Sequence, residues 1–189
     1  MNVVVGLGNP GDRYRRTRHN VGFMVLDALV ARAGSPPFRQ QADAWVAEAQ
    51  VGAEPVVFVK PSTFMNRSGV VLEPVLQSRA VGPESMIVVV DDIALELGTL
   101  RVRPGGSHGG HNGLRSVMEV LSTDEFARVR VGIRRGEVPG DLAEYVLSDF
   151  PREDVLVVQE VVGWAGDAIE CWINEGIEVT MNRFNGVRR

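Results

Sequence analysis

Short runs of β-branched residues alternate along this chain with stretches of helical periodicity, and turn residues separate the two. The β-branched runs predict strands over residues 2–5, 44–51, 56–59, 87–90, 100–103 and 128–133. The periodic stretches predict helices over residues 21–32, 68–79, 114–121, 152–174 and 179–184. Pro74 lies inside the second of these helices and is expected to kink it. Strands interleaved with helices indicate an α/β fold: a single domain over residues 1–189, with a mixed twisted sheet flanked by helices.

Composition supports a globular protein, because 44% of the 189 residues are hydrophobic and 23% are charged. The apolar runs are too short to span a bilayer, and the first residues lack the pattern of a signal peptide. Cys171 is the only cysteine, so no internal disulfide can form. We therefore expect a cytoplasmic protein without a membrane partner.

The distribution of charge is more informative than its sum. A net charge of −4 argues against a general nucleic-acid binder. All basic residues except Lys60 are arginines, however, and they cluster in residues 13–18, 101–103 and 128–135, whereas carboxylates dominate residues 137–178. This segregation predicts one face that attracts phosphates. Genome base composition is an alternative explanation of the arginine excess, and a weaker one of the clustering.

Three motifs in the chain suggest chemistry that their surroundings do not support. Residues 6–11 match the G-x-G-x-x-G dinucleotide fingerprint, but helical periodicity begins only near Val21 and no acidic residue closes a second strand. Residues 105–109 match the G-x-S-x-G elbow of serine hydrolases, but the glycines continue to Gly113 and indicate a mobile loop, so Ser107 is not expected to be a nucleophile.

The third motif is a set of metal-ligand types. His108 and His111, together with Asp91 or Asp92, offer such ligands. The two glycines between the histidines would not hold them on one helical face, so we expect no metal site.

A His-Asn pair occurs twice, as His19-Asn20 and as His111-Asn112, each among small or basic residues. The chain has only three histidines, and the third, His108, lies beside the second pair. Imidazole is the side chain whose unperturbed pKa permits proton transfer near neutral pH. The clustering predicts a site built for proton transfer.

Polar side chains also lie next to turn residues at or after the ends of predicted strands. They are Asn9, His19-Asn20, Asn66, Asp91-Asp92 and His111-Asn112. Ligand sites of open α/β sheets lie at the carboxyl ends of the strands, so we expect these side chains to converge. Each residue taken singly also has an explanation that involves no ligand. An asparagine can form a turn, Asp91 can cap a helix, and His19 can be an ordinary surface histidine. Because five such segments lie in equivalent places, these alternatives are less able to explain all of them together.

These motifs resemble the bacterial-type peptidyl-tRNA hydrolases, and the resemblance runs nearly from end to end. The segments that carry it are residues 5–11, 14–22, 60–69, 91–92, 105–116, 130–133 and 181–184. The resemblance implies hydrolysis of the ester between a peptide and the 3′-terminal ribose of tRNA, which recycles tRNA from prematurely released peptidyl-tRNA. It implies His19 as the general base that activates water and Asp91 as the carboxylate that orients it, without a cofactor.

Further roles follow only from the resemblance. Asn9 would distinguish peptidyl from free aminoacyl ends, while Asn66 and Asn112 would hydrogen-bond the substrate, with Asn112 or a nearby amide as the oxyanion donor. Tyr14 and Phe64 would line the site and stack on the terminal bases, and His111 would position the substrate.

The resemblance also implies a second contact region and some differences in detail. Arg101, Arg103 and Arg130 would clamp a tRNA phosphate, for which an ordinary solvated strand face is the alternative. Residues 105–113 would form a flexible gate over a monomeric enzyme. The chain has Ala94 where relatives often carry a second aspartate, and Val90 where they often carry a histidine, which affects only fine tuning of the gate and of local pKa values.

Two other functions remain open on the sequence alone. One is a non-catalytic RNA-binding protein of the same fold, which would need no arrangement of base and water. The other is a serine esterase acting through Ser107, for which Ser107 and not His19 would be essential.

Overall fold

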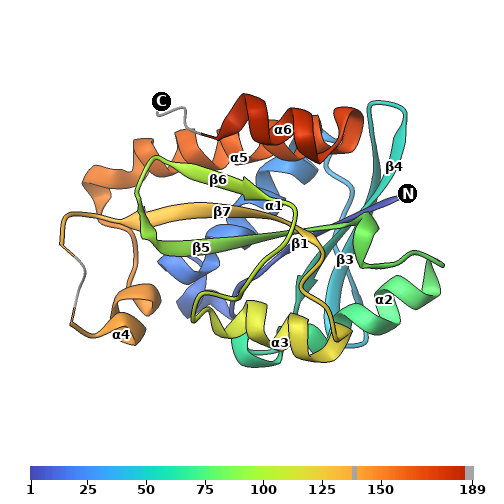
Figure 1. Cartoon of the computed structure of the whole chain (residues 1–189). Helices are drawn as coiled ribbons and strands as arrows, with labels where there is room; N and C mark the ends of the chain where they lie inside the picture. The colour runs from blue at the N-terminus through green and yellow to red at the C-terminus, as the bar shows by residue number, and fades with distance from the viewer. Residues whose placement is uncertain (138–139, 186–189) are drawn as a thin grey trace.

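The computed structural model describes residues 1–137 and 140–185, which form one seven-stranded sheet with helices on both faces (Figure 1). The strands lie in the order β2-β3-β4-β1-β5-β7-β6. Their bounds are β1 Asn2–Gly6, β2 Arg39–Gln41, β3 Ala44–Val51, β4 Glu54–Pro61, β5 Met86–Glu96, β6 Leu100–Arg103 and β7 Ala127–Arg134. The four central strands are parallel, whereas β2, β3 and β6 run antiparallel to their neighbours. The predicted mixed α/β sheet is confirmed.

Two layers of helices cover the sheet. Helices α1 (Val21–Arg32), α5 (Val155–Glu175) and α6 (Ile177–Phe184) pack on one face, and α2 (Leu72–Ser78) and α3 (Asn112–Leu121) pack on the other (Figure 1). The short helix α4 (Leu142–Leu147) contacts the 3-10 helix Arg18–Asn20. The other 3-10 helices are Asp12–Tyr14, Met65–Val71, Pro83–Ser85 and Arg152–Asp154. No helix within these described ranges has the length and hydropathy needed to cross a bilayer.

The central strands are buried on both faces, which explains their continuous apolar runs. Val4 of β1 packs with Leu26 of α1 in one core, and Val5 packs with Leu72 and Leu114 in the other. Burial of these apolar side chains holds α1 and α3 against opposite faces of the same strands. Both helices begin near the carboxyl ends of the parallel strands.

Close packing of β1 against α1 fixes where α1 begins. A Cβ atom on Gly6 would collide with the carbonyl oxygen of Gly22, and one on Gly22 would lie 2.5 Å from the carbonyl oxygens of Leu7 and Val89, so both positions require glycine. The 3-10 helix Asp12–Tyr14, and not a long helix, follows the glycine segment. Gly6 therefore serves helix packing, and the structure offers no support for a dinucleotide site.

The predicted helix over residues 68–79 is wrong in its first half. A 3-10 helix over Met65–Val71 precedes α2, and Arg67 has non-helical dihedral angles. Pro74 lies in the first turn of α2, where backbone N–H groups have no partner within the helix. The expected kink at Pro74 is absent for this reason, and the break lies before Leu72 instead.

The predicted strand over residues 87–90 is too short. Strand β5 continues to Glu96, so Asp91 and Asp92 lie inside it and pair with β7 before the register shifts. Two elements were not predicted: β2, which consists of three exposed polar residues, and α4, which has no buried residue. Strand β2 has no apolar residue, and α4 has only six residues, which is too short for its apolar spacing to identify a helix. Helix α1 and strands β3 and β6 have the predicted bounds.

Candidate active site

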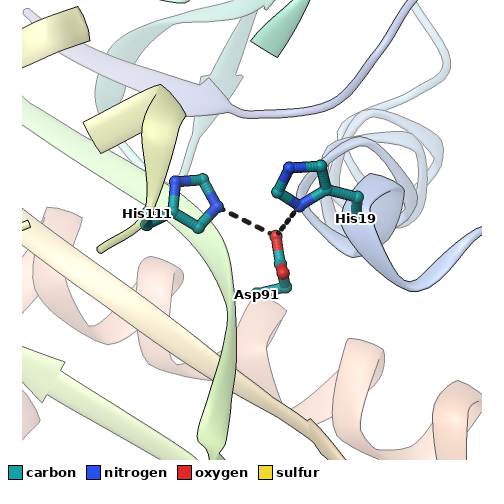
Figure 2. Close-up of side chains that lie close together, drawn as sticks. All are labelled: His19, Asp91 and His111. Atoms are coloured by element: carbon teal, nitrogen blue, oxygen red, sulfur yellow. Dashed lines mark hydrogen bonds and ion pairs between the residues drawn. The ribbon is translucent and has the colours of Figure 1, made fainter. Parts of the chain in front are cut away.

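One carboxylate joins two histidines inside β5, just beyond the point where β5 stops pairing with β1. Asp91 Oδ1 lies 2.7 Å from His19 Nδ1 and 3.0 Å from His111 Nε2 (Figure 2). His19 belongs to the 3-10 helix that precedes α1, and His111 is the N-cap of α3. The two helices on opposite faces of the sheet therefore bring both histidines to the same oxygen atom.

The hydrogen bonds assign a tautomer to each neutral ring. His111 Nδ1 accepts a bond of 3.2 Å from the backbone N–H of Leu114, so its proton lies on Nε2 and is donated to Asp91. His19 donates to Asp91 from Nδ1. Its Nε2 atom therefore carries the free lone pair and bonds to no residue in the described parts of the chain. A histidine in this state is able to accept a proton from water.

Asp91 is held in its charged form. Its exposed fraction is 5%, and such burial alone would raise the pKa of a carboxyl group. The two imidazoles that face the carboxylate outweigh burial and lower the pKa of Asp91 well below its usual range. The carboxylate is thus ionised at neutral pH and able to stabilise a positive charge on His19.

Ligand atoms of His19, Asp91 and His111 lie within 4.8 Å of one another. Both nitrogen-to-oxygen distances are those of hydrogen bonds, so a metal would have to displace a proton from each ring. His108, which the sequence offered as a ligand, is not part of this group, and its Nδ1 atom accepts from the backbone N–H of Gly110.

A hydrogen-bond network fixes Asn9 next to this centre. Asn20 Oδ1 accepts from the backbone N–H of Asn9, and Asn20 Nδ2 donates to the Asn9 carbonyl, each at 2.9 Å. Asn9 Oδ1 accepts from the backbone N–H of Met65 at 2.9 Å, which leaves Nδ2 as its free end within the described residues. The structural role of Asn20 was not predicted, although its place in the repeated His-Asn pair was a signal.

A cleft of about 280 Å³ opens beside the histidines. It is lined by His19, Asp91, residues 108–112, Arg130 and part of α4. Asn112, the first residue of α3, is exposed at this cleft, and Asn66 is exposed on the 3-10 helix that contains Met65. Both amides make no side-chain hydrogen bond to any described residue and are available to a ligand.

Two aromatic side chains lie edge to face near the same end of the sheet. The ring centres of Tyr14 and Phe64 are 6.4 Å apart, and 54% of Phe64 is exposed. Phe64 directly precedes Met65, which binds Asn9. An exposed pair of rings beside free amides provides a surface on which a planar base can stack.

The predicted arginines share one face of the sheet. Arg101 of β6 is paired with Arg130 of β7, so their side chains lie on the same face, and Arg103 is paired with Arg128. Arg101 and Arg103 are exposed, whereas Arg130 Nε lies 3.0 Å from Asp92 Oδ2.

Arg128 differs from these three because it is fully buried. It donates to the carbonyl oxygens of Gly106, at 2.6 Å, and of Asp124, at 2.8 Å. Arg128 therefore anchors the base of the glycine-rich loop and is not available to a ligand.

Nothing in the structure supports Ser107 as a nucleophile. Its hydroxyl has no hydrogen bond to any histidine in the described part of the chain, and its backbone carbonyl accepts from Arg128. A serine nucleophile requires an adjacent base.

Comparisons with known proteins agree along the whole chain. Residues 3–189 match the peptidyl-tRNA hydrolase family. The chain is 43% identical to the peptidyl-tRNA hydrolase of Alkaliphilus oremlandii, over 98% of this chain and 100% of that protein. It is 41% identical to the peptidyl-tRNA hydrolase of Brevibacillus brevis over 100% of both. A crystal structure of the peptidyl-tRNA hydrolase from Acinetobacter baumannii superposes with a TM-score of 0.91 at 28% identity, covering 100% of this chain and 96% of that one.

Proposed function

The chain belongs to the peptidyl-tRNA hydrolase family, and from this we propose that it cleaves peptidyl-tRNA with His19 as general base and Asp91 as the carboxylate that orients it. The reaction adds water across the ester, releasing the peptide as a carboxylic acid and the tRNA with a free terminal hydroxyl. The alternative of a non-catalytic RNA-binding protein receives no support.

The geometry of His19 carries this proposal. Its Nδ1 atom carries the ring proton and donates it in a hydrogen bond to Asp91 Oδ1, with 2.7 Å between the two atoms. Nε2 therefore has a lone pair that can take a proton from water. The resulting hydroxide oxygen bonds to the ester carbon, and His19 becomes an imidazolium next to the charged carboxylate. When the bond to the ribose oxygen breaks, the imidazolium returns its proton to that oxygen. Positioned general-base catalysis of this kind contributes about 10²–10⁴-fold.

Asn112 is the proposed donor to the oxyanion that forms when water attacks. Its side-chain amide is exposed at the cleft, and it is the first residue of α3. The amino end of a helix carries a partial positive charge, which also favours a negative oxygen there. Removal of one such donor typically costs about 10²–10³-fold in rate.

The free end of Asn9 suggests how a peptidyl end is distinguished from a free aminoacyl end. Because Oδ1 is bound to Met65, only the donor Nδ2 is left for the substrate. A donor suits the carbonyl oxygen of an acylated amino group, but it cannot bond an unacylated ammonium group, which offers only donors. Asn66 would add a second hydrogen bond, and His111 would position the substrate from beside Asp91.

The tRNA portion would lie over β6 and the aromatic pair. Arg101, Arg103 and Arg130 offer guanidinium groups on one face to a backbone phosphate, and such contacts carry no sequence information. Tyr14 and Phe64 would receive the terminal bases. Residues 105–113 would act as a gate above the cleft.

We further propose that residues 1–189 act as one domain and as a monomer in the cytoplasm, without a cofactor. The continuous sheet and the two cores it forms with its helices support one folding unit. His19, Asp91 and His111 are brought together by one chain, so no second copy is needed to join them.

The test is release of tRNA from N-acetyl-aminoacyl-tRNA, with His19→Ala and His108→Ala as a matched pair. His108 also lines the cleft, but among the described residues its ring is bound by the backbone N–H of Gly110 and not by Asp91. We therefore expect its variant to lose far less activity than His19→Ala, which should lose about 10³-fold. Chelator should have no effect. Equal rates in the two variants would refute His19 as the base, and a folded wild-type chain that binds tRNA without cleaving it would support the RNA-binding alternative.

A further inference from the structure

A second pocket, of about 360 Å³, lies on the other side of the end of β1 from the catalytic cleft. We call it the Lys60 pocket, and its lining includes Asn9, Asn20, Phe23, Phe38, Trp45 and Lys60. The catalytic cleft is built on β5 and β7, whereas Trp45 and Lys60 belong to β3 and β4. Because β1 lies between β4 and β5, the residues that follow it separate the two pockets.

The catalytic segment is part of the boundary. Asn20 follows the general base directly, and its side chain holds the backbone of Asn9. The residue that follows the proposed general base, Asn20, is therefore itself part of the wall of the Lys60 pocket. A substrate that extends from the ester in two directions has one pocket on each side.

The walls of the Lys60 pocket are aromatic, and its floor holds one buried cation. Lys60 Nζ lies 5.3 Å from the ring centre of Phe23 and 4.6 Å from that of Phe38. The Lys60 side chain is 10% exposed and is paired with Asp27, whose side chain is 63% exposed. Trp45, 40% exposed, adds a third aromatic surface.

This arrangement has the features of a binding site. Burial lowers the pKa of Lys60 although Asp27 opposes the shift, so keeping the charge there costs free energy. The ammonium has three N–H groups, of which Asp27 accepts one, so others remain for a ligand. Apolar walls with a few convergent polar groups are typical of small-molecule and peptide sites.

The charges indicate which half of the substrate would lie here. Asp12 and Asp27 line the pocket together with Lys60 and Arg15, so its charge is balanced and does not favour phosphate. The exposed arginines Arg101 and Arg103 lie on β6, the opposite edge strand from β2 and β3. The sheet thus offers exposed arginines on the β6 side of His19. On the β3–β4 side it offers a charge-balanced pocket with aromatic walls, beyond the pair Tyr14 and Phe64 proposed for the terminal bases.

We propose that the Lys60 pocket binds the peptide of peptidyl-tRNA, taking an apolar side chain upstream of the esterified residue while Lys60 donates to a peptide carbonyl. The inference rests on the proposed function and adds a preference to it. Peptides with large apolar side chains near the ester bind through this pocket, and a single acetylated glycine does not reach it.

The experiment compares two substrates with the same ester and the same tRNA: N-acetyl-Gly-tRNA and N-acetyl-Phe-Phe-Gly-tRNA. Trp45→Ala should lower kcat/KM for the longer substrate by about tenfold, mainly through KM, because it removes an apolar wall. The shorter substrate should change by less than about twofold. Trp45→Phe should restore most of the loss, and Leu156→Ala, which changes a residue that is 72% exposed on α5, should affect neither substrate.

Each result has a distinct meaning. Equal losses on both substrates, or no loss on either, would overturn the proposed peptide site. If Trp45→Ala also weakened inhibition by uncharged tRNA, the pocket would hold the terminal nucleotide instead, which likewise overturns the proposal. Failure of the wild-type chain to cleave either substrate would reject the proposed function itself, separately from the Trp45 comparison.

Discussion

Asp91→Asn isolates the role of charge in the site. Asparagine retains an oxygen that can accept from His19 and His111, so the ring positions can be kept. What the substitution removes is the negative charge facing the imidazolium that forms during hydrolysis. If the proposed mechanism is correct, the variant remains folded and binds substrate, but its kcat falls.

The size of the effect follows from the distance. With His19 Nδ1 2.7 Å from Asp91 Oδ1, the centres of the two delocalised charges lie about 4 Å apart. At an effective dielectric constant of about 20, that separation corresponds to roughly 4 kcal/mol. This free energy is equivalent to about 10³-fold in rate. Because the charge on His19 is only partly developed in the transition state, we expect a loss of about 10²–10³-fold in kcat.

The assay is single-turnover hydrolysis of N-acetyl-aminoacyl-tRNA at saturating enzyme, which reports the chemical step without the contribution of substrate affinity. Asp92→Asn is the matched control, since Asp92 is the adjacent buried carboxylate but faces Arg130. Its rate of hydrolysis should stay within a few-fold of wild type. A loss below about fivefold in Asp91→Asn, or equal losses in the two variants, would refute the electrostatic role assigned to Asp91.

Three further outcomes are expected. Arg101→Ala combined with Arg103→Ala should raise KM for tRNA substrates and leave kcat/KM for short ester mimics unchanged. Equal losses on both substrate classes would refute the proposed phosphate contact. The pKa of Asp91 is lowered in the folded state, so its contribution to stability is complete above the ordinary value of 3.8 and is lost as the pH falls below that value. The free energy of unfolding in urea should therefore depend less on pH in this acid range for Asp91→Asn than for wild type. His111→Ala should lose the cap on α3 and about 1 kcal/mol of stability, whereas His111→Asn should retain the cap; hydrolysis should fall in both, and full activity in His111→Asn would show that the ring has no role at Asp91.

The fold could be predicted well where local pattern and burial agree. Helix α1 and strand β3 match their predicted bounds because apolar periodicity and the turns that flank them give the same ends. Prediction was wrong where the limits depend on partners distant in sequence. Strand β5 continues through Asp91 because β7 pairs with it there, and no local pattern records that pairing.

The site was predicted in part from residue types and in part from family resemblance. Asp91 lies beside His19, but inside β5 and not at the strand end where the polar side chains were expected. The bond from His111 to the same oxygen was not predicted, since it depends on where α3 begins on the opposite face. The Lys60 pocket was missed for the same reason, because it joins α1 to β3 and β4, and the single lysine was its only signal in the sequence.

The repeated His-Asn pair has a structural explanation, because each pair stands at the start of a helix on a different face of the sheet. Helix α1 starts just after His19-Asn20, and α3 starts at His111-Asn112, each on its own face of the sheet. Both histidines then reach Asp91. Within the described parts of the chain, His19 keeps one ring nitrogen without a hydrogen bond, whereas His111 uses its second nitrogen to cap α3. The two rings are therefore not interchangeable: in the proposed mechanism His19 takes the proton from water, whereas both ring nitrogens of His111 are already hydrogen-bonded.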